Sequence, residues 1–95
     1  MQSNGFGFHR RAFMALGELS DAERAAIMER LEALSRIPPR DWHANVVRRA
    51  GSATPLYLIR IDESLRVLIA VPDGRAPEVV DVVRHEMLQQ FATAE

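Results

Sequence analysis

The sequence contains no cysteine and no lysine, and both absences restrict its function. Without cysteine, neither a disulfide framework nor a thiolate metal site is available. All 12 basic residues are therefore arginines, which bind phosphate and carboxylate groups through a planar fork of donors. The net charge of −1 argues against a broad nucleic-acid-binding surface. A role with nucleic acid would need arginines gathered on one face.

Long apolar runs are also missing. The longest, Val67 to Val71, is far too short to span a bilayer. The first residues do not show the basic start and apolar stretch of a secretion signal. With 95 residues, 47% of them apolar, the chain predicts one globular domain over residues 1–95. We expect a cytoplasmic protein that does not associate with membranes.

The first part of the chain predicts a helix that begins at His9 or Arg10 and ends near Gly17. Its apolar residues Ala12, Phe13 and Leu16 recur at helical spacing, which predicts that they share a face. Gly17 is expected to end the helix in a left-handed conformation. Before this helix, Gly5 to Phe8 alternates small and aromatic residues and predicts a short edge strand.

A second helix is predicted from Asp21 to about Arg36. Ser20 and Glu23 have the spacing of a capping box, in which each side chain accepts a hydrogen bond from the backbone of the other. The prolines after Arg36 end the helix, because proline disfavours helical geometry in the preceding residue. The expected buried stripe consists of Ile27, Leu31 and Leu34. The two helices form a helical hairpin.

After Arg40 the hydrophobic period changes to that of strands. The predicted class is α+β, with the N-terminal helical hairpin packed on one face of a mostly antiparallel sheet of about four strands. Trp42 is expected to cover the junction between helices and sheet. The predicted strands are Asn45 to Arg49, Leu56 to Asp62, Leu65 to Val71 and Glu78 to Arg84.

Alternation along the strands predicts which side chains face the helices. Ile59 and Ile61 on one strand, and Val67 and Ile69 on the next, are expected in the core, so Arg60 and Arg66 face the other way. The last strand allows two registers. Either Val80 and Val82 face the helices, or Val79 and Val83 do. We favour the first, because it keeps Asp81 out of the core.

The candidate site is the arginine face of this sheet. Arg60 and Arg66 lie equally far from the predicted turn, so they should pair directly across the strands. Facing arginines repel each other unless an anion or carboxylate lies between them. His85, at the end of the last strand, can transfer a proton near neutral pH, with Asp81 or Glu86 to orient it. These groups suit metal-free cleavage of a phosphodiester through a ribose 2′-hydroxyl.

A plain structural role for the same residues is the alternative, because solvent-facing sheets commonly carry arginine and acidic residues. Asp81 would then neutralise both arginines. The three histidines, His9, His43 and His85, are too scattered for a metal cluster, so we expect neither a metal nor another cofactor.

The chain resembles the RelE/ParE superfamily of toxins from bacterial type II toxin–antitoxin systems. Three segments carry the resemblance. Phe8 to Ala12 is similar to the family's first strand running into its first helix. Leu56 to Ile61 with Leu65 to Val71 resembles its central hairpin. Val79 to Glu86 is similar to its last strand, which often closes with arginine or histidine.

The resemblance implies a toxin that cleaves mRNA on the ribosome, as RelE-like members do. It also implies a cognate antitoxin as partner. Arg60, Arg66 and His85 would match catalytic positions, with Glu86 beside them, or with Arg84 in place of His85 if the register slips. Arg48, Arg49 and Arg84 would bind substrate. The alternative is a non-enzymatic ParE-like inhibitor of DNA gyrase or a repurposed binding protein, which the near-neutral charge and the absence of lysine favour.

Overall fold

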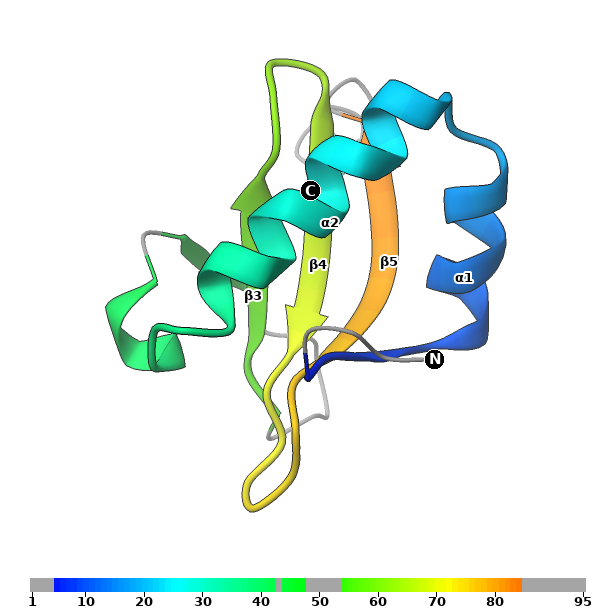
Figure 1. Cartoon of the computed structure of the whole chain (residues 1–95). Helices are drawn as coiled ribbons and strands as arrows, with labels where there is room; N and C mark the ends of the chain where they lie inside the picture. The colour runs from blue at the N-terminus through cyan, green and yellow to red at the C-terminus, as the bar shows by residue number, and fades with distance from the viewer. Residues whose placement is uncertain (1–4, 43, 48–53, 85–95) are drawn as a thin grey trace, which may run out of the picture.

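The computed structural model describes residues 5–42, 44–47 and 54–84 (Figure 1). These ranges contain α1 (Arg10–Gly17), α2 (Asp21–Leu34) and a short 3-10 helix, η1 (Pro39–Asp41). The strands are β1 (Gly7–Phe8), β2 (Asn45–Val47), β3 (Leu56–Arg60), β4 (Leu65–Ala70) and β5 (Glu78–Arg84). They form a five-stranded sheet in the order β1-β5-β4-β3-β2.

The sheet is mixed. The β2–β3, β3–β4 and β4–β5 pairs are antiparallel, as the short connections predict, whereas β1 runs parallel to β5. The expected class, α+β with a mostly antiparallel sheet, is therefore confirmed in part, since the sheet has five strands rather than about four and one pair is parallel. The predicted helical hairpin on one face is also matched only in part, because α2 lies across the sheet whereas α1 lies beside β5 (Figure 1). The Gly7 N–H donates to Pro77 O at 3.0 Å and the His9 N–H to Val79 O at 2.8 Å. The start of the chain thus forms the sheet edge beyond β5.

Helix α1 begins as predicted but ends differently. The His9 side chain accepts a hydrogen bond from the Arg11 N–H and caps the first turn. Gly17 does not adopt the expected left-handed conformation. Within the described ranges, only Gly5 and Gly74 have a positive φ. The helix ends instead in a tightened turn, in which the Glu18 N–H donates to Ala15 O at 3.1 Å.

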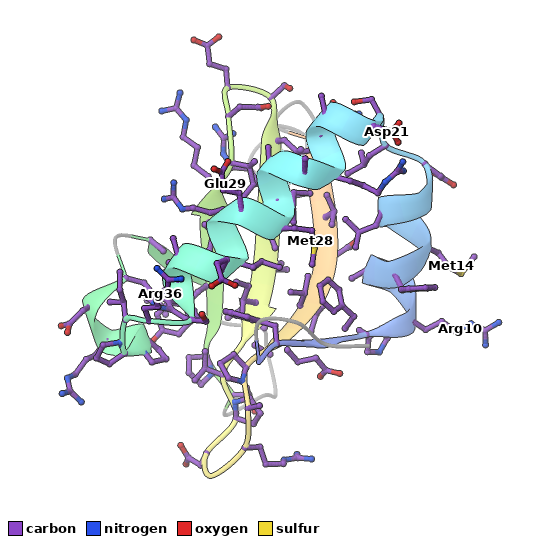
Figure 2. The ribbon with its side chains drawn as sticks, viewed as in Figure 1. Arg10, Met14, Asp21, Met28, Glu29 and Arg36 are labelled. Atoms are coloured by element: carbon purple, nitrogen blue, oxygen red, sulfur yellow. The ribbon has the colours of Figure 1, made fainter. Side chains whose placement is uncertain are left out.

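The exposed face of α1 carries apolar side chains. Ala12 is fully buried, but Phe13 is 69% exposed, so the prediction that both share the buried face is wrong. Each helical residue turns the side chain by about 100°, so Leu16, four residues on, stays beside Ala12 whereas Phe13 rotates away. Met14 and Arg10 also project away from the sheet (Figure 2).

Helix α2 crosses the sheet diagonally in front of β3, β4 and β5, while α1 lies beside β5 (Figure 1). The predicted capping box is present, with Ser20 Oγ and Glu23 Oε1 each accepting a backbone hydrogen bond at 3.1 Å. The helix ends at Leu34, two residues before the predicted end. Neither helix in the described ranges is long and apolar enough to cross a membrane.

The core lies between α2 and the sheet, as the stripe on α2 predicts. Ile61, which was expected to be fully buried, is half-buried and packs against the core margin. Trp42 covers the junction as predicted, and its indole N–H donates to Ile37 O at 2.9 Å. The fully or largely buried members that were predicted are Ile27, Leu31, Leu34, Ile59, Val67 and Ile69.

A β-bulge in β5 combines the two registers that alternation allowed. Val79 pairs with Ile69 and Val82 with Val67, so both lie on the α2 side of the sheet. Val80 is the extra residue between them. The predicted placement of Val80 toward the helices is therefore wrong, whereas that of Val82 is correct. A bulge adds one unpaired residue and so changes the alternation partway along a strand.

Candidate functional site

Arg60 and Arg66 are directly paired across β3 and β4, as their equal distance from the turn predicts. They lie on the face opposite α2, because Ile59 and Val67, the next pair along, are buried against that helix. We call this opposite surface of the sheet the outer face. Two guanidinium groups thus start from neighbouring positions on one face of the sheet, where Val83, the β5 partner of Arg66, is buried. Facing cations favour an anion between them.

The turn that joins β3 to β4 holds Arg66 of this pair in place. The Asp62 carboxylate accepts hydrogen bonds from the Ser64 N–H and the Leu65 N–H, each at 2.8 Å. These bonds, with the one from Ser64 as the largest cause, lower the pKa of Asp62. The Arg66 guanidinium donates to the backbone oxygen of Asp62. The turn therefore fixes the position of Arg66 through the backbone, while Arg60 is exposed.

Asp81 lies on the outer face, paired with Leu68, as the favoured register predicts. Its Oδ1 accepts a hydrogen bond from the Val82 N–H at 2.8 Å, and its Oδ2 lies 3.9 Å from Nη1 of Arg11. Among the described residues, the ion pair of Asp81 is thus with helix α1. Arg60 forms no ion pair within the same ranges. The structural alternative, in which Asp81 neutralises both arginines of the pair, is not what these contacts indicate.

Arg84 lies on the other side of the sheet. It pairs in register with Leu65, which is fully buried on the α2 side. Its Nη1 donates to Oε2 of Glu23 at 2.9 Å, and Nη2 lies 3.4 Å from Oε1. The structure therefore joins β5 to the start of α2 through Arg84 and does not bring this residue to Arg60 and Arg66.

Because of the Arg84–Glu23 ion pair, the free energy of unfolding should fall at acid pH. The hydrogen bond from Arg84, followed by that from the Ser20 backbone, lowers the pKa of Glu23 from 4.5 to about 2. Because the folded pKa lies below the unfolded one, this stabilisation is complete above pH 4.5 and is lost as the pH falls toward 2. We expect Glu23→Gln to flatten the fall in melting temperature over this range, and Glu29→Gln on exposed α2 surface to leave it unchanged. An equal acid response in both variants would contradict the assignment.

Four predicted site residues lie outside the described residues: Arg48, Arg49, His85 and Glu86. The proposed proton-transfer role of His85 and Glu86 and the substrate role of Arg48 and Arg49 remain predictions. Within the described ranges, no group of three or more histidine and acidic residues is placed to hold a metal ion.

Sequence reasoning missed a second pair of arginines at the far end of the outer face, beside a histidine. A pocket there has a volume of about 320 Å³ and is lined in part by His9, Arg11 and Arg75. These residues come from the start of α1 and from the loop between β4 and β5. No local motif joins them, and only the parallel pairing of β1 with β5 brings them together.

Comparison with known proteins gives a structural match. No family model and no curated protein matches the sequence. The fold is similar to a chain in the crystal structure of the archaeal RelE–RelB complex from Pyrococcus horikoshii OT3, with a TM-score of 0.62. The match covers 84% of this chain and 94% of that chain, at 19% sequence identity.

The chain therefore has a RelE-like fold. The two helices, the mixed sheet and the order of elements extend over most of both chains, which confirms at the level of fold the resemblance seen in the sequence. At this identity the likeness establishes the fold alone, because one fold commonly supports different functions.

Proposed function

We propose that this protein is the toxin of a type II toxin–antitoxin system and cleaves mRNA without a metal ion. The observation that carries the proposal is the direct cross-strand pairing of Arg60 and Arg66 on the outer face. A sheet face that serves only solubility gains nothing from facing like charges, which destabilise a strand pair. A bound phosphate removes this cost.

The proposed chemistry uses the phosphate as the reacting group. The ribose 2′-oxygen attacks phosphorus, the bond from phosphorus to the 5′-oxygen breaks, and the 5′-oxygen takes up a proton. Arg60 and Arg66 stabilise the charge that develops on the phosphoryl oxygens. His85 would donate the proton that the 5′-oxygen takes up, and Glu86 would accept the proton that the 2′-hydroxyl releases. The products are a 2′,3′-cyclic phosphate and a 5′-hydroxyl.

A partner chain is expected on β2. Within the described residues this strand pairs with β3 alone, and the side chain of Val46 is 51% exposed. An open strand edge can accept a strand from another protein. The similar structure is a complex of RelE with RelB, which supports a cognate antitoxin as the partner.

The second candidate is a non-enzymatic ParE-like toxin that inhibits DNA gyrase. The net charge of −1 and the absence of lysine favour it, because ribosome-bound nucleases must approach a highly charged RNA surface. In this alternative the arginine pair would hold a carboxylate or phosphate of its target without breaking a bond.

Induced expression in a bacterium separates the two candidates. We expect growth to stop, cellular mRNA to be fragmented and plasmid supercoiling to stay unchanged. If a small DNA-binding protein is encoded next to this chain, its co-expression should restore growth. Growth arrest with intact mRNA and altered supercoiling would contradict the nuclease proposal and support the gyrase candidate.

A further inference from the structure

The pocket at the far end of the outer face lies in line with the arginine pair. Leu56 and Ala70, which line it, are paired across β3 and β4, and Arg60 lies four residues further along β3 than Leu56. At about 3.3 Å per strand residue, the two positions are about 13 Å apart. The pocket and the arginine pair therefore occupy opposite ends of one surface.

The pocket has an apolar floor and a rim that carries two exposed arginines, Arg11 and Arg75. Leu56, Ala70 and Val80 form part of the floor, and Val80 is present because the β5 bulge adds a residue there. Its volume, about 320 Å³, is at the lower end of the range for sites that bind small molecules, about 300–1,000 Å³. The floor can accept a flat, weakly polar group.

The rim can accept an anion. The Arg11 side chain is 72% exposed and lies 3.9 Å from Asp81, too far for a hydrogen bond. The Arg75 side chain is exposed and forms no ion pair within the described ranges. Glu78 also lines the pocket and Asp81 pairs with Arg11, so within the described ranges Arg75 is the arginine of the rim that forms no ion pair with a carboxylate.

An apolar path joins the pocket to the arginine pair. Leu58 and Leu68 are paired across the strands between the two ends, on the same face, and both are half-buried. A ligand on this path meets cations at one end, leucines in the middle, and an apolar floor with cations at the other end. Single-stranded nucleic acid suits such a surface, because its phosphates repeat at regular intervals and the faces of its bases are flat and weakly polar.

We propose that the pocket binds one nucleotide of a single-stranded RNA, a few nucleotides from the phosphate at Arg60 and Arg66. The base occupies the floor, and Arg11 and Arg75 contact its phosphate. This inference rests on the proposed function, since it assigns the pocket to the same RNA. It makes the pocket a determinant of which sequence is bound beside the cleaved bond.

Binding of a short RNA tests the pocket. The probe is a fluorescent 2′-O-methyl oligoribonucleotide of about seven nucleotides, which cannot be cleaved through its 2′-oxygens. We expect Arg75→Ala to weaken binding about tenfold, because a phosphate contact is lost, and Arg30→Ala on α2 to leave it unchanged. Equal affinity for the Arg75→Ala variant and the wild type would overturn the proposal. A competing acidic peptide provides a second check. If the peptide displaces the RNA and binds the Arg75→Ala variant more weakly than the wild type, the pocket is a peptide site and the proposal is overturned.

A second measurement separates the pocket from the nuclease proposal. Adenosine monophosphate is titrated into the Arg60→Ala/Arg66→Ala variant while backbone amide signals are followed by NMR. Shifts centred on Ala70 and Val80 support the pocket even if the wild-type protein cleaves no mRNA. Shifts that are absent from these residues would overturn it even if cleavage is observed.

Discussion

Replacing both members of the arginine pair should remove toxicity while the protein stays folded. In the Arg60→Ala/Arg66→Ala variant the outer face loses the two cations that are proposed to hold the phosphate, so the developing charge is no longer stabilised. We expect cells expressing it to grow like cells without the protein. Growth is measured after induction, together with the amount of soluble protein and its melting temperature.

The matched control removes the same charge elsewhere. Arg30 lies on the exposed side of α2 and Arg36 just after its end, both away from the outer face, and Arg36 forms an ion pair with Glu32. The Arg30→Ala/Arg36→Ala variant should remain toxic. Undiminished toxicity of the folded Arg60→Ala/Arg66→Ala variant would sink the nuclease proposal and leave the non-enzymatic alternative in its place.

Leu31→Ala should lower the free energy of unfolding by about 2–5 kcal/mol. Leu31 is fully buried on α2, in the same cluster as Ile59 and Val67 of the sheet. Its truncation removes apolar contacts and leaves a cavity in the core between α2 and the sheet. Domains of this kind are stable by about 5–15 kcal/mol, so the loss is a large share of the total. Urea unfolding followed by circular dichroism measures it.

Two further variants make the result interpretable. Glu29→Ala, on the exposed side of α2, should change stability by less than about 0.5 kcal/mol. Leu31→Met keeps most of the volume and should cost less than about 1.5 kcal/mol if Leu31→Ala proves too unstable to measure. A Leu31→Ala loss no larger than that of Glu29→Ala would show that α2 does not pack through this residue.

Local patterns were sufficient for much of the fold. The capping box at Ser20 and Glu23 and the stripe through Ile27, Leu31 and Leu34 depend on neighbours within a few turns of helix, so sequence spacing predicts them. The Arg60–Arg66 pair depends on one short turn, and counting from that turn was enough. Phe13 was misplaced because adjacent apolar residues leave the buried face of a short helix undecided.

Contacts between distant segments were harder to predict. The parallel pairing of β1 with β5 joins residues about 70 positions apart, and no turn signals it. The bulge at Val80 depends on packing against β4, and neither uniform register allowed for it. The pocket with Arg11 and Arg75 requires both features, so it was visible only in the structure.

The chemical ends of the mRNA fragments test the central claim most directly. Fragments are isolated from cells after induction of the wild-type protein, and their termini are mapped. Cells that express the Arg60→Ala/Arg66→Ala variant are the negative control. Attack by the 2′-oxygen predicts a 2′,3′-cyclic phosphate, or the 3′-phosphate that forms from it, and a 5′-hydroxyl at each cut. Intact mRNA in arrested cells, or fragments with 3′-hydroxyl and 5′-phosphate ends, would contradict it.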